Sequence, residues 1–120
     1  MPHTILVVED DDELLLLYRH NLAREDYRIL EATNGVEALE ILETESPDLV
    51  ILDILMPAMS GETVLQRIQS TPEWRDIKVV VVSAYPSYRK KAMELGADAF
   101  LVKPMPLDDI LAAISSQLED

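Results

Sequence analysis

The sequence predicts a doubly wound α/β domain, with five helices packed on the two faces of a five-stranded parallel sheet. Five short apolar runs alternate along the chain with five segments of helical periodicity. Three of these runs are almost wholly apolar and rich in β-branched residues, as in strands that are covered on both faces. A length of 120 residues suits one domain with its own core, so we expect a single domain over residues 1–120.

The strands and helices can be placed in order along the chain. The predicted strands are Thr4–Glu9, Arg28–Ala32, Leu49–Asp53, Lys78–Ser83 and Ala99–Lys103. Apolar spacing of three and four residues marks a helix after each strand. The residues predicted on the marked faces are Leu14, Leu17, Tyr18, Asn21 and Leu22; Val36, Leu39, Ile41 and Leu42; Val64, Leu65 and Ile68; Ala92, Met93 and Leu95; and Ile110, Leu111 and Ile114. Gly96 is predicted to end the fourth helix in a left-handed conformation.

Composition excludes several classes of function. The formal net charge of −13 argues against direct nucleic-acid binding, which needs a basic face, and favours bound cations or a basic partner. The absence of cysteine excludes disulfides, thiol catalysis and cysteine-based zinc sites. No apolar run approaches the roughly 20 residues of a membrane span, and the first residues do not resemble a signal peptide. We therefore expect a cytoplasmic protein that does not associate with membranes.

The ends of the predicted strands carry the chemistry. In open parallel sheets, sites form beyond the carboxyl ends of the strands. The first strand ends in Glu9 and is followed by Asp10 and Asp11, and the third strand ends in Asp53. Helix capping explains the next two acids of the first run, but not acids placed directly at a strand end. If the first and third strands are neighbours, Asp10 and Asp53 converge, and a divalent cation such as Mg²⁺ relieves their repulsion.

Two further strand ends complete a set of groups suited to phosphoryl transfer. Ser83 ends the fourth strand with a hydroxyl donor, and Lys103 ends the fifth with a compact positive charge that we expect to pair with Asp53. A metal and an ammonium group neutralise developing charge, while a carboxylate attacks phosphorus. Asp53 is thus predicted to be the nucleophile and to form an aspartyl phosphate.

At this point the chain resembles the receiver domain of two-component response regulators, the CheY-like family. The resemblance rests on four segments, VVEDD from Val7, DILMPAMSG from Asp53, VVVVSA from Val79 and ELGADAFLVKP from Glu94, and covers essentially the whole chain. It implies a flavodoxin-like fold with strand order 2-1-3-4-5. It also implies a phosphorylation-activated switch, which takes its phosphoryl group from a sensor histidine kinase or a histidine phosphotransfer protein.

The resemblance assigns roles to individual residues. Glu9, Asp10, Asp53 and the Leu55 carbonyl would form the Mg²⁺ site. Ser83 would move toward the phosphoryl group on Asp53, and Lys103 would contact that group. Phe100 would be the switch aromatic that turns inward on activation, and the Lys103–Pro104 bond would be cis. The protein would not be an enzyme acting on other substrates, although it would catalyse its own phosphoryl capture and autodephosphorylation.

Two surfaces are also implied. The phosphodonor would meet the first helix and the loop after Lys103, through Leu14, Leu15, Leu17, Met105 and Pro106. The helical spacing predicts that Leu14 and Leu17 point inward, so that Leu15 and Leu16 point partly outward.

The second implied surface is the output surface, formed by the fourth helix, the fifth strand and the fifth helix. A basic cluster on the fourth helix would belong to it, and the members of this cluster are Arg89, Lys90 and Lys91. The output partner is left open, and a phosphorylation-dependent homodimer is among the options.

Three alternatives differ from this interpretation. A haloacid-dehalogenase-like phosphatase fits the D-x-D of Asp10 to Asp12, but Glu13 follows where that family has Gly and Thr, and the chain has no cap-sized insertion. A flavodoxin-like electron carrier would share the fold, yet the acids of the first loop would repel a flavin phosphate. A pseudo-receiver that docks without phosphorylation would not require intact Asp53, Ser83 and Lys103.

Overall fold

The computed structural model describes residues 3–56 and 59–119 and contains a five-stranded parallel sheet in the order β2-β1-β3-β4-β5. The strands are β1 (Thr4–Val8), β2 (Arg28–Ala32), β3 (Leu49–Asp53), β4 (Lys78–Ser83) and β5 (Ala99–Val102). The predicted fold class and strand order are confirmed. The first and fifth strands end one residue earlier than predicted, which places Glu9 and Lys103 just beyond the sheet.

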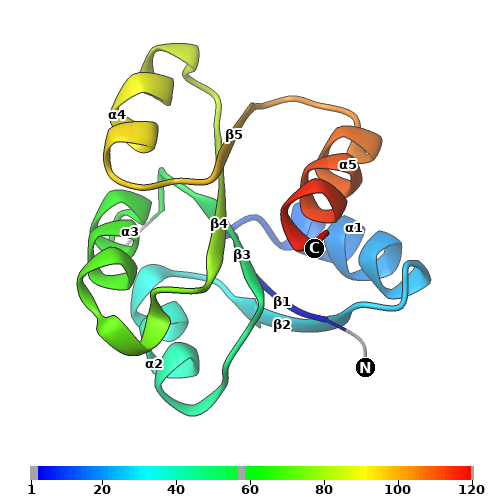
Figure 1. Cartoon of the computed structure of the whole chain (residues 1–120). Helices are drawn as coiled ribbons and strands as arrows, with labels where there is room; N and C mark the ends of the chain where they lie inside the picture. Colours follow the sequence, from blue (N-terminus) through cyan, green and yellow to red (C-terminus); the bar gives the residue numbers. More distant parts are fainter. Residues whose placement is uncertain (1–2, 57–58, 120) are drawn as a thin grey trace.

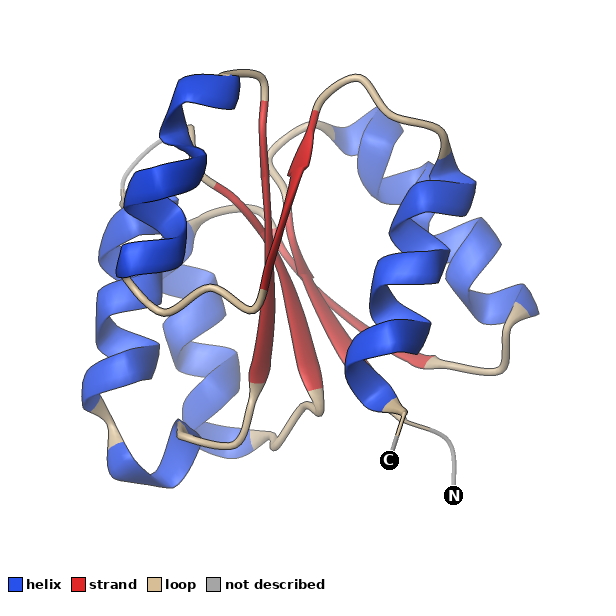
Figure 2. Cartoon of the chain, turned by 45° about the horizontal axis from the view of Figure 1, so that its top comes forward, coloured by secondary structure: helices blue, strands red, loops and turns tan. Residues whose placement is uncertain are grey.

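Helices cover both faces of the sheet, as Figures 1 and 2 show. The α-helices are α1 (Asp12–Arg24), α2 (Gly35–Thr44), α3 (Gly61–Ser70), α4 (Arg89–Glu94) and α5 (Leu107–Leu118), with short 3₁₀ helices η1 (Pro72–Trp74) and η2 (Pro86–Tyr88). α1 and α5 pack on one face, and α2, α3 and α4 on the other. In the described part of the chain, no helix is long and apolar enough to cross a membrane.

Two buried clusters form the core, one on each side of the sheet. β3 is buried along its whole length, because it is the central strand and both of its faces are covered. The cluster beneath α1 and α5 includes Ile5, Val7, Tyr18, Ile51 and Ile114. The cluster beneath α2, α3 and α4 includes Leu6, Leu52, Ile68, Val81 and Phe100. Alternate residues of each strand thus enter opposite clusters, as the two-residue period of a strand requires.

The helix ends follow local sequence signals. The Asp11 side chain caps α1 by accepting hydrogen bonds from the amides of Glu13 and Leu14, at 2.9 and 3.3 Å. Asp12 and Glu13 lie in the first turn of α1 as predicted, but the capping side chain is Asp11, which was predicted among the acids at the strand end. Gly96 follows the end of α4 with φ of +102°, which confirms the predicted left-handed position.

The predicted helix faces need three corrections. On α1 the buried residues are Leu15, Tyr18 and Leu22, whereas Leu17 is half-exposed. On α2 and α4, Val36 and Met93 were predicted to face the core but are 46% and 42% exposed. Ala92 is buried as predicted, and Ala38, which was not assigned to the predicted face of α2, is buried as well. Small residues allow a helix to approach the sheet closely, and a search for large apolar side chains underweights them.

Candidate functional site

The carboxyl ends of β1 and β3 bring three acids together. β1 pairs with β3 so that Val8 lies opposite Leu52, and the next residues along the two strands are Glu9 and Asp53. Carboxylate oxygens of Glu9, Asp10 and Asp53 lie within 4.8 Å of one another. Glu9 and Asp53 are buried, and Asp10 is exposed at the mouth of the cluster. We call these three residues the acidic cluster.

Strand periodicity explains why the acidic cluster and Lys103 meet on one side of the sheet. Val7, Ile51 and Leu101 all contact the core cluster beneath α1 and α5. Glu9, Asp53 and Lys103 each follow one of these residues by two positions, so they continue the same face past the ends of the strands. Segments that are distant in sequence therefore need no special loop geometry to build the site.

Lys103 bridges the two buried acids. Its Nζ donates to Glu9 Oε1 at 2.8 Å and to Asp53 Oδ2 at 3.1 Å, so the predicted pairing with Asp53 is present and Glu9 shares it. Burial lowers the pKa of Lys103, but the Glu9 hydrogen bond and the charges of both acids outweigh burial and hold the pKa above its ordinary value. Lys103 is therefore cationic near neutral pH.

Glu9 is the acid whose ionisation the site disfavours. Burial raises the pKa of Glu9 to about 7, and the neighbouring Asp53 charge adds to this effect, while hydrogen bonds from Lys103 and the Asp11 amide oppose it. One ammonium group does not balance three carboxylates. Oxygen donors with excess negative charge are the ligand set that Mg²⁺ takes in proteins, so the residues present fit this metal.

The loop after β3 is tightly packed against Asp53. A Cβ atom on Gly61 would lie 2.2 Å from the Asp53 carbonyl oxygen, so a side chain there would force the loop away from the strand. The Gly61 amide donates to the Ile54 carbonyl at 2.9 Å and closes the loop at the start of α3. Leu55 is exposed in this loop. Pro57 and Ala58, which belong to the segment from Asp53 to Gly61, lie outside the described residues.

Ser83 and Phe100 lie on the opposite face of the sheet from the acidic cluster. Ser83 follows the core residue Val81 by two positions, and Phe100 belongs to the same core cluster as Val81. Ser83 is 2% exposed, and its Oγ accepts from the Tyr85 amide at 3.1 Å. The Ser83 hydroxyl is thus turned toward its own loop, at the end of the strand that pairs with β3.

Phe100 is buried in this structure, with 4% of its surface exposed. The guanidinium of Arg89 lies 5.2 Å from the centroid of the ring and donates to the Phe100 carbonyl at 3.3 Å. The resemblance predicted that this aromatic turns inward on activation, and the ring already lies inward here. A phenyl ring has no hydroxyl to leave unpaired, so its burial carries no polar penalty.

The predicted donor surface on α1 must be corrected at one residue. Leu15 is 4% exposed and packs against the sheet, so it is not available to a partner. Leu17 is 50% exposed, and Leu14 is partly buried. The stripe that faces the sheet runs through Leu15, Tyr18 and Leu22. Tyr18 and Leu22 were predicted on it, but Leu15 is buried in place of Leu14 and Leu17, because four consecutive leucines leave the rotation of the helix undetermined in sequence.

A small apolar groove lies beside Lys103. It has a volume of about 200 Å³ and is lined by Leu14, Leu17, Lys103, Pro104, Met105, Leu107 and Ile110. The lining joins α1 to the loop that precedes α5, as the predicted donor surface requires. Pro106 is exposed between two lining residues, and the Lys103–Pro104 bond is cis.

The basic cluster begins α4, on the other side of the molecule from this groove. Its three members, Arg89, Lys90 and Lys91, are all exposed. Arg89 reaches back to Phe100, whereas Lys90 and Lys91 form no ion pair with any described residue. The cluster therefore lies at the surface, and its role in output stays a prediction.

Two tyrosines were not assigned roles from the sequence. The Tyr88 hydroxyl donates to the Glu62 carboxylate and ties the segment after β4 to the start of α3. Tyr18 was predicted to lie on the inner face of α1, and it is 1% exposed. Among the described residues, its hydroxyl is the buried side-chain polar atom without a hydrogen-bond partner. A tyrosine in an otherwise aliphatic stripe was the sequence signal for this feature.

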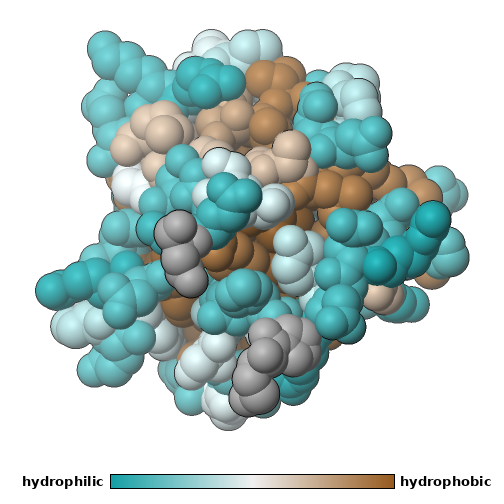
Figure 3. All heavy atoms as spheres, turned by 45° about the vertical axis from the view of Figure 1, so that its right-hand side comes forward, coloured by the Kyte–Doolittle hydropathy of each residue, from teal (hydrophilic) through white to brown (hydrophobic). Residues whose placement is uncertain are grey.

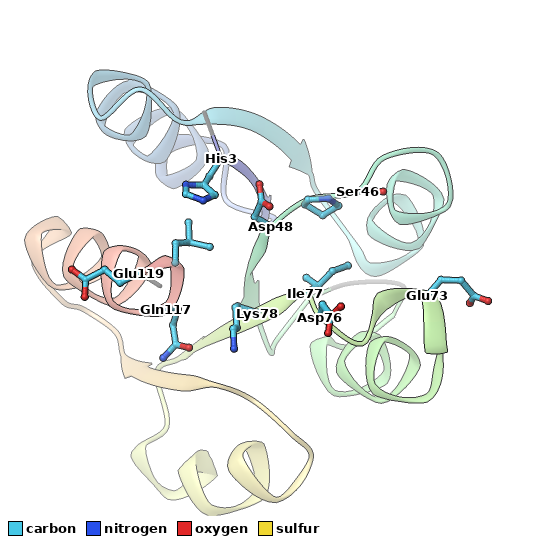
Figure 4. A pocket seen from close by; sticks show the side chains of 11 residues that line it. His3, Ser46, Asp48, Glu73, Asp76, Ile77, Lys78, Gln117 and Glu119 are labelled. Carbon is cyan, nitrogen blue, oxygen red and sulfur yellow. The ribbon is translucent and has the colours of Figure 1, made fainter. Parts of the chain in front are cut away.

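A broader depression lies at the amino ends of the strands, opposite the acidic cluster. It has a volume of about 430 Å³, and its lining includes His3, Asp48, Lys78 and Gln117 (Figure 4). Its charged side chains do not converge on one point, and Glu73 and Glu119 project away from each other in this view. Open α/β sheets bind ligands at the carboxyl ends of their strands. The site therefore lies at the acidic cluster rather than in this depression.

Comparison with known proteins assigns the chain to a family. The family model for the response regulator receiver domain matches residues 5–115. The response regulator MprA of Mycobacterium sp. (strain KMS) is 35% identical over 98% of this chain and 51% of its own length. Sporulation initiation phosphotransferase F of Bacillus subtilis (strain 168) is 34% identical over 98% of this chain and 95% of its own length.

A solved structure agrees with these sequence matches. The response regulator TrrA from Thermotoga maritima, in complex with Mg²⁺-BeF, is similar with a TM-score of 0.88 and 35% identity, over 97% of this chain and 99% of the other. The chain belongs to the family of response regulator receiver domains, which act in phosphorylation-based two-component signalling with histidine kinases or phosphotransfer proteins. It spans about half the length of the MprA relatives that it matches.

Proposed function

We propose that the protein is a phosphorylation switch in which Asp53 takes a phosphoryl group from a phosphohistidine, with Mg²⁺ as the cofactor. The donor is a sensor histidine kinase or a histidine phosphotransfer protein. The observation that carries the proposal is the position of Asp53. Its carboxylate ends the central strand, is buried beside two other acids and lies 3.1 Å from the Lys103 ammonium. A carboxylate nucleophile with a flexible cationic side chain beside it suits phosphoryl capture.

The chemistry follows from the groups around Asp53. An Asp53 carboxylate oxygen attacks phosphorus, the P–N bond breaks, and its electron pair returns to the donor imidazole. Lys103 leaves the two acids to pair with a phosphoryl oxygen, and the Ser83 hydroxyl turns to donate to another. Mg²⁺, held by Asp10, Asp53 and the Leu55 carbonyl with Glu9 beside it, would neutralise charge on the phosphoryl oxygens when bound.

The phosphoryl group is then lost to water, which breaks the P–O bond and restores the Asp53 carboxylate with release of inorganic phosphate. The protein therefore catalyses its own phosphorylation and dephosphorylation, and it is not an enzyme that turns over other substrates. Phosphorylation changes the conformational state of the protein, and its functional result is an altered surface for a partner.

The donor docks on the groove formed by Leu14, Leu17, Met105, Leu107 and Ile110, next to Lys103. Figure 3 shows apolar side chains gathered among hydrophilic ones on the face where α1 and α5 come forward. The exposed Leu16 and Leu17 extend this apolar surface along α1. A donor helix seated here would bring its phosphohistidine to the mouth of the acidic cluster, because Lys103 belongs to both features.

The output is carried by α4, β5 and α5. Ser83 and Phe100 lie on the face of the sheet that α4 covers, and Arg89 joins α4 to Phe100. Movement of Ser83 toward the phosphoryl group releases the Tyr85 amide and shifts the segment before α4. The exposed basic cluster, with Lys90 at its centre, then meets a partner through an altered surface, and that partner is a second copy of the chain if phosphorylation drives dimerisation. The net charge of −13 fits a protein partner in the cytoplasm better than nucleic acid.

Intact mass after incubation with Mg²⁺ and acetyl phosphate tests the proposal. We expect one added phosphoryl group on the parent and none on Asp53→Asn, which keeps the size of the side chain but removes the nucleophilic carboxylate. Asp48→Asn, at the opposite end of β3, is the matched control and should be labelled like the parent. If acetyl phosphate and a phosphorylated histidine protein both fail to label the parent, the chain is a docking module that works without phosphorylation.

A further inference from the structure

The Tyr18 hydroxyl is an unusual feature of this core. It lies on the inner face of α1, 1% exposed, among the aliphatic side chains of β1, β3 and α5, and it has no hydrogen-bond partner among the described residues. A buried hydroxyl without a partner destabilises a protein, whereas phenylalanine would fill almost the same space without that penalty. A group that is unsatisfied in one state of a protein can be satisfied in another.

Three arguments indicate that this hydroxyl points toward the end of the core nearest the acidic cluster. Side chains on a helix lean toward its N-terminus, and α1 begins beside the cluster, after Asp11. Tyr18 packs on the face of the sheet that Glu9 and Asp53 continue past the strand ends. Besides burial, the negative charges of Glu9 and Asp53 raise the pKa of Tyr18, so both acids act on its hydroxyl. The hydroxyl is thus a neutral donor in the core cluster whose face of the sheet Glu9 and Asp53 continue.

In this structure, both carboxylate oxygens of Glu9 already accept hydrogen bonds, so Glu9 does not need the Tyr18 hydroxyl as a donor. Oε1 of Glu9 accepts from Lys103 at 2.8 Å, and Oε2 accepts from the Asp11 amide at 3.2 Å. When Lys103 moves to a phosphoryl group, as the proposed function requires, Glu9 loses its strongest donor while it remains buried. A buried carboxylate that loses its ammonium partner is destabilised. Mg²⁺ in the acidic cluster would offset part of this loss by its charge, and a hydrogen-bond donor beside Glu9 would offset more of it.

We propose that Tyr18 is a positioning residue of the phosphorylated state, in which its hydroxyl donates to the Glu9 carboxylate after Lys103 has moved to the phosphoryl group. The inference rests on the proposed function. The unpaired hydroxyl destabilises the resting state, and its hydrogen bond to Glu9 removes this penalty in the activated state. Tyr18 therefore shifts the balance between the two states toward activation without contacting the phosphoryl group.

Tyr18→Phe tests this because it should change the two states in opposite directions. In EDTA, we expect the variant to melt roughly 2 to 5 °C above the parent, since an unpaired hydroxyl has been removed. With Mg²⁺ and beryllofluoride as the phosphoryl mimic, we expect it to be stabilised less than the parent. Its Kd for beryllofluoride should rise roughly tenfold, as for loss of a hydrogen bond to a charged group.

Tyr27→Phe is the matched control, because Tyr27 packs against the same core cluster at the other end of α1. It should leave the beryllofluoride affinity unchanged. Equal shifts of melting temperature for Tyr18→Phe with and without the mimic, together with an unchanged affinity, would show a purely structural role and overturn the inference. A parent that takes neither phosphoryl group nor beryllofluoride would instead overturn the proposed function, and this inference with it.

Discussion

Glu9 illustrates how a single buried residue sets the state of the site. Its side chain is 2% exposed, it shares Lys103 with Asp53, and burial raises its pKa to about 7. Near neutral pH, a proton and a metal ion therefore compete for the same carboxylate. Metal binding to the acidic cluster should strengthen as pH rises through this range, because ligand carboxylates must be ionised.

The raised pKa of Glu9 predicts how stability depends on pH in the metal-free protein. Between about pH 4.5 and 7, folded Glu9 retains a proton that the unfolded chain has released. The free energy of unfolding should therefore fall as pH rises through this window. Glu9→Gln should remove this part of the decline, on the order of 1 to 3 kcal/mol. Urea unfolding in EDTA at a series of pH values measures it.

Glu13→Gln is the control for this experiment, because Glu13 is exposed in the first turn of α1. It should keep the slope of the parent between pH 4.5 and 7. If Glu9→Gln also keeps that slope, the acidic cluster ionises without strain and the electrostatic description of the site is wrong.

At the scale of an element, α1 separates two roles along its surface. Leu15, Tyr18 and Leu22 hold the helix on the sheet, while Leu14 and Leu17 line the groove beside Lys103. The N-cap at Asp11 ties the same helix to the acidic cluster, since the Asp11 amide donates to Glu9. One helix thus contributes to the core, to the groove and to the acidic cluster. Alanine substitutions at neighbouring leucines should therefore affect different properties.

Leu15→Ala and Leu17→Ala form a matched pair that tests this division. Leu15→Ala should lower the free energy of unfolding by about 2 to 5 kcal/mol, because it leaves a cavity in a close-packed core. Leu17→Ala should change stability by less than about 1 kcal/mol but slow phosphotransfer from a phosphorylated histidine protein. Acetyl phosphate, which needs no docking surface, should label Leu17→Ala at the rate of the parent. Equal stability losses for the two variants would contradict the helix rotation seen here.

At the scale of the whole molecule, the net charge of −13 opposes compaction, and the acidic cluster concentrates part of this charge in a small volume. Cations therefore act on the molecule in two ways. Any salt screens the surface charges, whereas a divalent ion can also occupy the cluster. A binding contribution must be separated from the screening contribution.

Millimolar MgCl₂ should raise the melting temperature above that in NaCl of equal ionic strength. A ligand that binds only the folded state stabilises it by about 2.7 kcal/mol at a concentration about one hundred times its Kd. Asp10→Asn should abolish the extra stabilisation by Mg²⁺ and retain the response to NaCl. Identical melting curves in the two salts would count against a Mg²⁺ site at the acidic cluster.

The sequence predicted most of the fold and the chemistry of the site for identifiable reasons. Alternation of apolar runs with helical spacing predicts strands and helices, and polar residues stand out against the apolar runs that they end. Asp53, Ser83 and Lys103 were found in this way, and so was the acidic run that includes Glu9. The burial of Val36, Leu15 and Leu17 was predicted wrongly, because alternative helix rotations bury similar apolar surface.

By itself, the sequence determined which chemical groups stand at the ends of the strands, since this follows from local order along the chain. The tertiary structure decided which of these groups meet. The pairing of β1 with β3 sets Glu9 beside Asp53, and the position of β5 brings Lys103 within hydrogen-bond distance of both. It also decided the rotation of α1, which leaves the Tyr18 hydroxyl buried in the core without a partner among the described residues. The rotation of α1 and the pairing of the strands depend on the packing of the whole core, which no local sequence pattern determines.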